Sequence, residues 1–137
     1  MRRLAFACIV AAASVSSASA QDLAAGETSF KKCLPCHSVG PEAKNKVGPV
    51  LNGLDGRKSG TVEGYNYSEA NKNSGLTWND EVFRKYIKNP REAIPNTKMV
   101  FAGIKVSEEA EKAKTDEITN LWGYLAQFDD KGGIKKK

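Results

Sequence analysis

The feature that most constrains this chain is a short motif, Cys33-Leu34-Pro35-Cys36-His37, near the start of its 137 residues. It separates two thiols by three positions and places the only histidine of the chain directly after the second thiol. Such a pattern serves three kinds of chemistry: thiol–disulfide bonding, metal coordination, and covalent attachment of a haem. The remaining residues discriminate between them.

Residues 1–20 have the features of a secretory signal peptide. Two arginines precede an apolar run that is too short to span a bilayer, and Ala18-Ser19-Ala20 forms a small-residue cleavage site. An uncleaved membrane anchor is the alternative. Cleavage after Ala20 predicts a periplasmic domain, residues 21–137, without a stable membrane anchor. It also removes Cys8, so the motif then holds the only thiols.

Two kinds of chemistry fit the sequence poorly. A disulfide between Cys33 and Cys36 closes a loop too short to restrict the unfolded chain much, and a thioredoxin-like pair needs a strand–helix–strand pattern that is not present. A zinc site needs three or four protein ligands, but the motif offers only Cys33, Cys36 and the adjacent His37. Thiol redox chemistry stays open as an alternative.

Attachment of a haem explains the spacing of the motif. One helical turn separates the thiols of Cys33 and Cys36, so both reach vinyl groups on one edge of the ring, and His37 reaches the iron as an axial ligand. The sequence therefore predicts one haem c, bound through two thioethers.

Met99 is the candidate for the second axial position. It is the only methionine after residues 1–20, it lies in a turn-rich segment, and the chain has no second histidine. A His/Met pair is typical of electron carriers, although packing in the core is the commoner role of a single methionine. If Met99 does not bind the iron, the open position would suit a haem enzyme such as a peroxidase.

Hydrophobic periodicity predicts an all-α domain of short helices and long loops. A first helix is expected over residues 22–32, with Leu23 and Phe30 on one face. A last helix has apolar residues at helical spacing, namely Ile118, Leu121, Trp122, Leu125 and Phe128.

Between these helices, Thr77 is the expected N-cap of a third helix that ends at Asn89-Pro90. Its apolar face consists of Val82, Phe83, Tyr86 and Ile87. Residues 38–77 have almost no periodicity apart from a short helix near 67–71. A prosthetic group would explain so long a loop, because the loop could wrap around it.

An ordered series of glycine, proline and aromatic residues follows the first motif. The series is Gly48-Pro49-x-Leu51-x-Gly53-x-x-Gly56-Arg57, Gly64-Tyr65-x-Tyr67-Ser68-x-Ala70-Asn71-Lys72-Asn73, Trp78, Tyr86, Asn89-Pro90 and Pro95-x-Thr97-Lys98-Met99-x-Phe101. It resembles class I c-type cytochromes, close to the mitochondrial and cytochrome c2 groups, over nearly all of residues 21–137.

The resemblance implies the class I cytochrome c fold, with helices and loops wrapped around one haem, and a role for each matched residue. Pro49 would accept a hydrogen bond from His37, and Arg57, Tyr67 and Trp78 would hold the propionates; surface charge and core packing are the alternative roles of these three. A polar network near Met99 would comprise Asn71, Tyr86 and Thr97. The first and last helices would cross through Gly26, Phe30, Leu121, Tyr124 and Leu125.

Two features depart from the resemblance. Asn96 stands where the family usually has glycine, and asparagine tolerates the left-handed backbone expected there. The segment Lys105–Glu117 is longer than in the family's close members. It is expected to be a helical extension or a loop that serves as a solvated spacer.

Charge is distributed unevenly along the domain. Without the two arginines of residues 1–20 the formal charge falls from +5 to +3. Basic residues flank the haem-binding segments, namely Lys31, Lys32, Lys44, Lys46, Lys88, Arg91, Lys98 and Lys105, whereas acidic residues gather between Glu108 and Asp130. This asymmetry predicts a lysine-rich face that docks anionic partners; a generic solvated surface is the alternative.

The resemblance also implies partners. We expect a monomeric, non-enzymatic carrier that takes electrons from a membrane bc1-type complex and delivers them to a photosynthetic reaction centre or a respiratory terminal oxidase. Nucleic acid is not expected as a partner of an exported haem protein.

Overall fold

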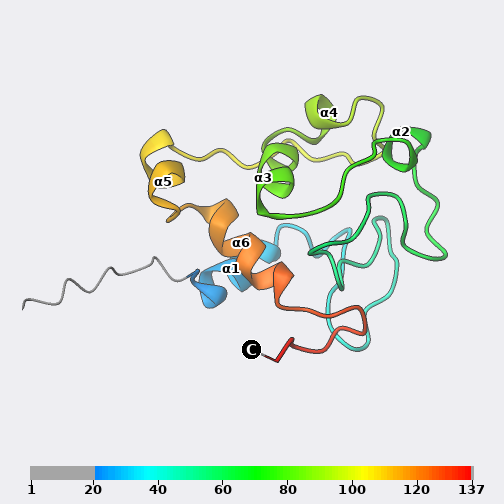
Figure 1. The fold of residues 1–137 in the computed structure, drawn as a ribbon, viewed down its shortest axis with the longest axis horizontal. Helices are drawn as coiled ribbons and strands as arrows, with labels where there is room; N and C mark the ends of the chain where they lie inside the picture. Colours follow the sequence, from blue (N-terminus) through cyan, green and yellow to red (C-terminus); the bar gives the residue numbers. More distant parts are fainter. Residues whose placement is uncertain (1–20, 137) are drawn as a thin grey trace, which may run out of the picture.

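Short helices joined by long loops make up the part of the chain that the structure describes, residues 21–136 (Figure 1). In this computed structural model the helices are α1 (Leu23–Phe30), α2 (Glu69–Lys72), α3 (Asp80–Lys88), α4 (Pro90–Ala93), α5 (Glu108–Ala113) and α6 (Glu117–Ala126). Within residues 21–136 there is no strand, only two isolated β-bridges, so the expected all-α class is confirmed. The predicted signal peptide, residues 1–20, lies outside the described residues. Over the described range, no helix has both the length and the apolar character needed to cross a membrane.

The first and last helices cross near the centre of the molecule, where α1 lies against α6 (Figure 1). Gly26 lies at the crossing. A β-carbon on it would come within 2.1 Å of Asn120 O, so glycine is needed for the two backbones to approach this closely. The ring of Phe30 is 5.5 Å, centroid to centroid, from that of Tyr124. The predicted contact of Gly26 and Phe30 with the last helix is present.

Helix α1 departs from the prediction in two respects. It ends at Phe30 rather than Lys32, because residues 31–36 form a series of turns. Leu23 is 44% exposed, so the predicted apolar face is wrong there. It lies in the first turn, before the crossing, and the buried residues of α1 are Gly26 and Phe30.

Helix α6 buries the face that its periodicity predicts. Asp116 is its N-cap and accepts a hydrogen bond from Thr119 N at 3.0 Å. The predicted residues are all buried, namely Ile118, Leu121, Trp122, Leu125 and Phe128, the last of them beyond the end of the helix. This face joins Phe30 and Phe83 in the core.

Helix α3 begins at a different residue from the one predicted. Its N-cap is Asn79, whose Oδ1 accepts from Val82 N at 2.9 Å. The predicted cap, Thr77, forms a β-bridge with Lys58 instead, two residues before the cap. The predicted face is buried at Phe83, Tyr86 and Ile87 and half-buried at Val82. The helix ends before Asn89, and Pro90 takes the first position of α4, where its missing N–H costs nothing.

The loops agree with two further expectations. The short helix predicted near residues 67–71 is the single turn of α2, which starts two residues later, at Glu69, because Ser68 is its N-cap. The preceding residues, 38–68, contain no helix. Asn96 has φ 66°, the left-handed conformation expected of a residue that replaces glycine. The long segment Lys105–Glu117 is a helical extension that contains α5.

Candidate functional site

A cavity of about 380 Å³ lies between the loops and helices α3 and α6. Most of its wall is apolar, with Leu51, Leu54, Phe83, Ile87 and Phe101 among the lining residues. The structure brings all eight predicted site residues to this wall, namely Cys33, Cys36, His37, Pro49, Arg57, Tyr67, Trp78 and Met99. They come from segments up to sixty-six positions apart, so the fold, rather than chain proximity, gathers them.

The two cysteines lie in the turn directly after α1. His37 N donates to Cys33 O at 2.8 Å, a helix-like bond that keeps both thiols and the imidazole together. Neither Cys33 nor Cys36 is in a disulfide. Burial raises the pKa of the Cys33 thiol to about 11, and Glu117 contributes to the rise. Thiol exchange needs a thiolate, so this surrounding disfavours the redox alternative.

His37 is held in one orientation. Its Nδ1 is 2.7 Å from Pro49 O, the contact that the resemblance implied. Because a carbonyl can only accept, Nδ1 carries the proton and Nε2 keeps a lone pair for a metal. Burial lowers the pKa of His37, against the opposing effect of the Pro49 bond, and this favours the neutral ring. Gly48 makes room for the ring, since a β-carbon there would lie 2.4 Å from His37 Cε1.

Arg57 brings a positive charge to the cavity without a carboxylate partner. Its Nη1 donates to Asn52 O at 2.6 Å and to Val50 O at 3.2 Å. Its buried Nε has no hydrogen-bond partner among residues 21–136, and no ion pair involves it there. Burial lowers the pKa of Arg57 from its usual value. The buried Tyr67 and Trp78 line the same cavity.

Polar side chains surround Met99, which lies sixty-two positions after His37 in the sequence. Tyr86 Oη donates to Met99 Sδ at 3.1 Å. Thr97 Oγ1 donates to Asn71 Oδ1 at 2.8 Å, and Ser68 Oγ donates to the same oxygen at 2.7 Å. The network implied by the resemblance is thus present, and Ser68 extends it. The sequence indicated Ser68 only as a residue next to a predicted short helix. That position suits an N-cap and does not indicate a functional site.

The cavity fits the predicted prosthetic group. A haem is flat and largely apolar and carries two carboxylates, and the cavity combines apolar walls with a buried guanidinium whose Nε is unsatisfied. A neutral imidazole and a thioether are suitable iron ligands. The wall that holds the imidazole also holds both thiols.

Apolar and basic residues surround the opening of the cavity. Val47 and Val100 line it and are 75% and 82% exposed, which no feature of the sequence indicated. Lys32 and Lys98 also line it. Of the eight predicted docking residues, however, Lys32 pairs with Glu117 at 2.6 Å and Lys88 with Glu111 at 2.5 Å. Carboxylates therefore already occupy part of the predicted basic face.

Known proteins resemble this chain in sequence and in structure. No protein-family model matches the chain. It is 56% identical to cytochrome c2 of Blastochloris viridis over 135 residues, covering 98% of this chain and 100% of that one. It is 58% identical to cytochrome c-550 of Bradyrhizobium diazoefficiens over 113 residues, covering 82% and 77%. The solved structure of cytochrome c2 from Rhodospirillum centenum matches with a TM-score of 0.66 and 38% identity, covering 79% of this chain and 98% of that one. The chain belongs to the class I c-type cytochromes, electron-transfer proteins that carry one covalently bound haem c.

Proposed function

We propose that this cytochrome shuttles electrons in the periplasm, from a membrane bc1-type complex to a reaction centre or a terminal oxidase. Bound haem would supply the Fe(III)/Fe(II) couple. Thioether bonds from Cys33 and Cys36 would fix it, and His37 and Met99 would occupy the two axial positions. Export would follow cleavage after Ala20.

The hydrogen bond from Tyr86 to Met99 is the observation that carries this proposal. Donation to Sδ at 3.1 Å fixes the thioether in the cavity that the imidazole of His37 also lines. With His37 and Met99 as ligands, the protein would leave no iron position for oxygen or peroxide, which would favour electron transfer over catalysis. The Pro49 bond and the bond from Tyr86 would hold the two ligands in place as the iron changes oxidation state.

The remaining site residues have supporting roles. Arg57 would pair with a propionate, because over the described range its guanidinium has no anionic partner and its Nε is unsatisfied. Tyr67 would add a second donor. Its hydroxyl oxygen accepts from Val62 N at 3.3 Å, and within residues 21–136 its proton has no acceptor. Trp78 would pack beside them. The protein would act as a monomer that docks through the basic opening of the cavity.

Absorption spectra of the exported protein test the proposal. We would produce the full chain in a host with haem-attachment machinery and record oxidised and reduced spectra, with Met99→Ala as the control. Ligation by Met99 gives a weak far-red band in the oxidised form that disappears on reduction and is missing from the control. Covalent haem without that band in the parent would support the enzyme alternative. A correctly exported chain without haem would return the cysteines to thiol chemistry.

Cleavage and docking need separate measurements. The intact mass of the exported holoprotein should correspond to a chain that starts at Gln21. Retention of residues 1–20 would indicate a membrane anchor. For docking, Lys98→Gln should slow oxidation by an anionic acceptor at low ionic strength, because Lys98 lines the opening of the cavity.

A further inference from the structure

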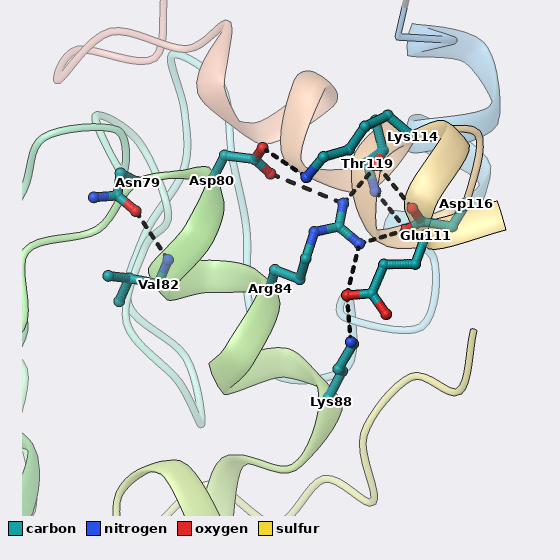
Figure 2. Close-up of polar contacts among 9 residues, drawn as sticks. All are labelled: Asn79, Asp80, Val82, Arg84, Lys88, Glu111, Lys114, Asp116 and Thr119. Carbon is teal, nitrogen blue, oxygen red and sulfur yellow. Dashed lines mark hydrogen bonds and ion pairs between the residues drawn. The ribbon is translucent and has the colours of Figure 1, made fainter. Parts of the chain in front are cut away.

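Helix α5 lies on the surface and none of its residues is buried. It contacts α3 through a carboxylate (Figure 2). Glu111 Oε1 is 2.5 Å from Lys88 Nζ and 3.9 Å from Arg84 Nη1. The same oxygen thus faces two cations from successive turns of α3. Charge rather than apolar packing holds this part of the segment.

A buried ion pair fixes the end of the segment that carries Glu111. Arg84 is 6% exposed and donates to Asp116 Oδ1 at 3.0 Å and to Thr119 Oγ1 at 2.5 Å (Figure 2). Asp116 is 4% exposed and caps α6. Arg84 and the cap of α6 are fixed. Pairing Glu111 with Lys88 therefore costs less side-chain conformational entropy than forming an isolated surface ion pair.

Lys88 follows directly on two residues of the cavity wall, Tyr86 and Ile87. The carbonyl oxygen of its neighbour Ile87 accepts a hydrogen bond from Ile104 N at 2.9 Å. Ile104 belongs to the loop that follows Met99. Lys88 therefore lies beside the haem-binding segments, where its charge would add to the basic face. Its pairing with Glu111 cancels that charge locally.

We propose that Glu111 sets the limit of the docking face: it neutralises Lys88, so that an acidic partner protein engages the basic residues of this face that form no ion pair. Glu117, six positions further along the chain, does the same to Lys32. The inference rests on the proposed docking function and adds a specificity determinant to it. Within the described residues, Lys31, Lys44, Arg91 and Lys105 form no ion pair and stay available.

The test compares Glu111→Gln with Glu81→Gln. Both variants remove one negative charge and break an ion pair with a lysine of α3, since Glu81 pairs with Lys85 at 2.8 Å. Glu111→Gln also loses the 3.9 Å contact with Arg84. The reduced holoprotein is mixed with hexacyanoferrate(III), which takes one electron from Fe(II) and becomes hexacyanoferrate(II). We expect Glu111→Gln to raise the rate about two- to threefold at low ionic strength and to steepen its salt dependence, beyond the effect of Glu81→Gln. A cationic cobalt(III) acceptor should respond in the opposite sense.

A second readout needs no electron transfer. Acetylation of surface lysines, followed by mass spectrometry, should show Lys88 protected in the parent and reactive in Glu111→Gln, with Lys44 as the unpaired reference. Adding Lys88→Gln to Glu111→Gln should return the rate to that of the parent.

The outcomes test the docking face and the role of Glu111 separately. If Lys98→Gln slows the reaction but Glu111→Gln matches Glu81→Gln, the inference is overturned and the docking face stands. Equal acetylation of Lys88 and Lys44 in the parent also overturns it. If Lys98→Gln has no effect, the docking face fails, and the limit assigned to Glu111 fails with it.

Discussion

Replacing Asp116 tests how far a buried ion pair stabilises this cytochrome. Asp116 and Arg84 are 4% and 6% exposed, and their 3.0 Å contact joins α6 to α3 (Figure 2). Removing one partner of a buried pair costs about 3–5 kcal/mol, because the other charge is left without compensation. We expect Asp116→Ala to lower the free energy of unfolding by that amount. Asp116→Asn keeps a side chain that can cap α6, so its cost should be about 1 kcal/mol smaller.

The dependence on pH follows from the same contact. Burial would raise the pKa of Asp116, but the bonds from Arg84 and from Thr119 outweigh it and lower the pKa. A depressed pKa in the folded state adds stability above the unfolded value of about 3.9, and this stability disappears as the pH falls through the folded value. The parent should therefore lose this contribution in acid below about pH 4, while Asp116→Asn should lack it at every pH.

Guanidinium unfolding of the holoproteins, followed by circular dichroism from neutral to acid pH, measures both effects. Glu81→Gln is the matched control, since it breaks an exposed i,i+4 pair, which is worth only about 0.3–0.5 kcal/mol. The reasoning is refuted if Asp116→Asn costs no more than Glu81→Gln at neutral pH. It is equally refuted if Asp116→Asn loses stability in acid in parallel with the parent.

Three further changes probe the site and its turns. Tyr86→Phe removes the hydrogen-bond donor to Met99 Sδ and should lower the midpoint potential, because a sulfur without that bond donates more strongly to Fe(III). Voltammetry measures the potential, and an unchanged or higher value would contradict the geometry. Gly48→Ala should sharply reduce haem incorporation, measured as the haem-to-protein ratio, because its β-carbon would clash with His37; full incorporation would exclude the close contact. At Asn96, with φ 66°, alanine should cost about 1 kcal/mol in denaturant unfolding and glycine much less; equal costs would argue against a left-handed turn.

Local patterns in the sequence were enough to predict much of this fold. The period of the last helix identified Ile118 and Leu121, both 0% exposed, because one buried stripe determines that pattern. The cap of α3 was misplaced because Thr77 and Asn79 both have capping side chains, and the competing bridge from Thr77 to Lys58 depends on a loop nineteen positions away.

The candidate site was predictable where a motif specifies chemistry over a few residues, and it was not where distant segments meet. The turn from Cys33 to His37 is local, and the structure forms it as the spacing requires. Outside the site, the buried Arg84 was missed because periodicity treats a charged residue as exposed, and its partner Asp116 is thirty-two positions along the chain. The exposed Val47 and Val100 had no signal, since isolated surface valines occur in any protein.

The crossing of α1 and α6 has a consequence for folding kinetics. Asp22 N donates to Asn120 Oδ1 across ninety-eight positions, so the ends of the domain are tied together and the haem-binding loops form one closed ring of chain. Closing so long a loop costs entropy before any contact compensates for it, and such non-local contacts slow folding. The amides at the crossing should therefore exchange with solvent only when the whole domain unfolds, while those of the intervening loops exchange through smaller openings.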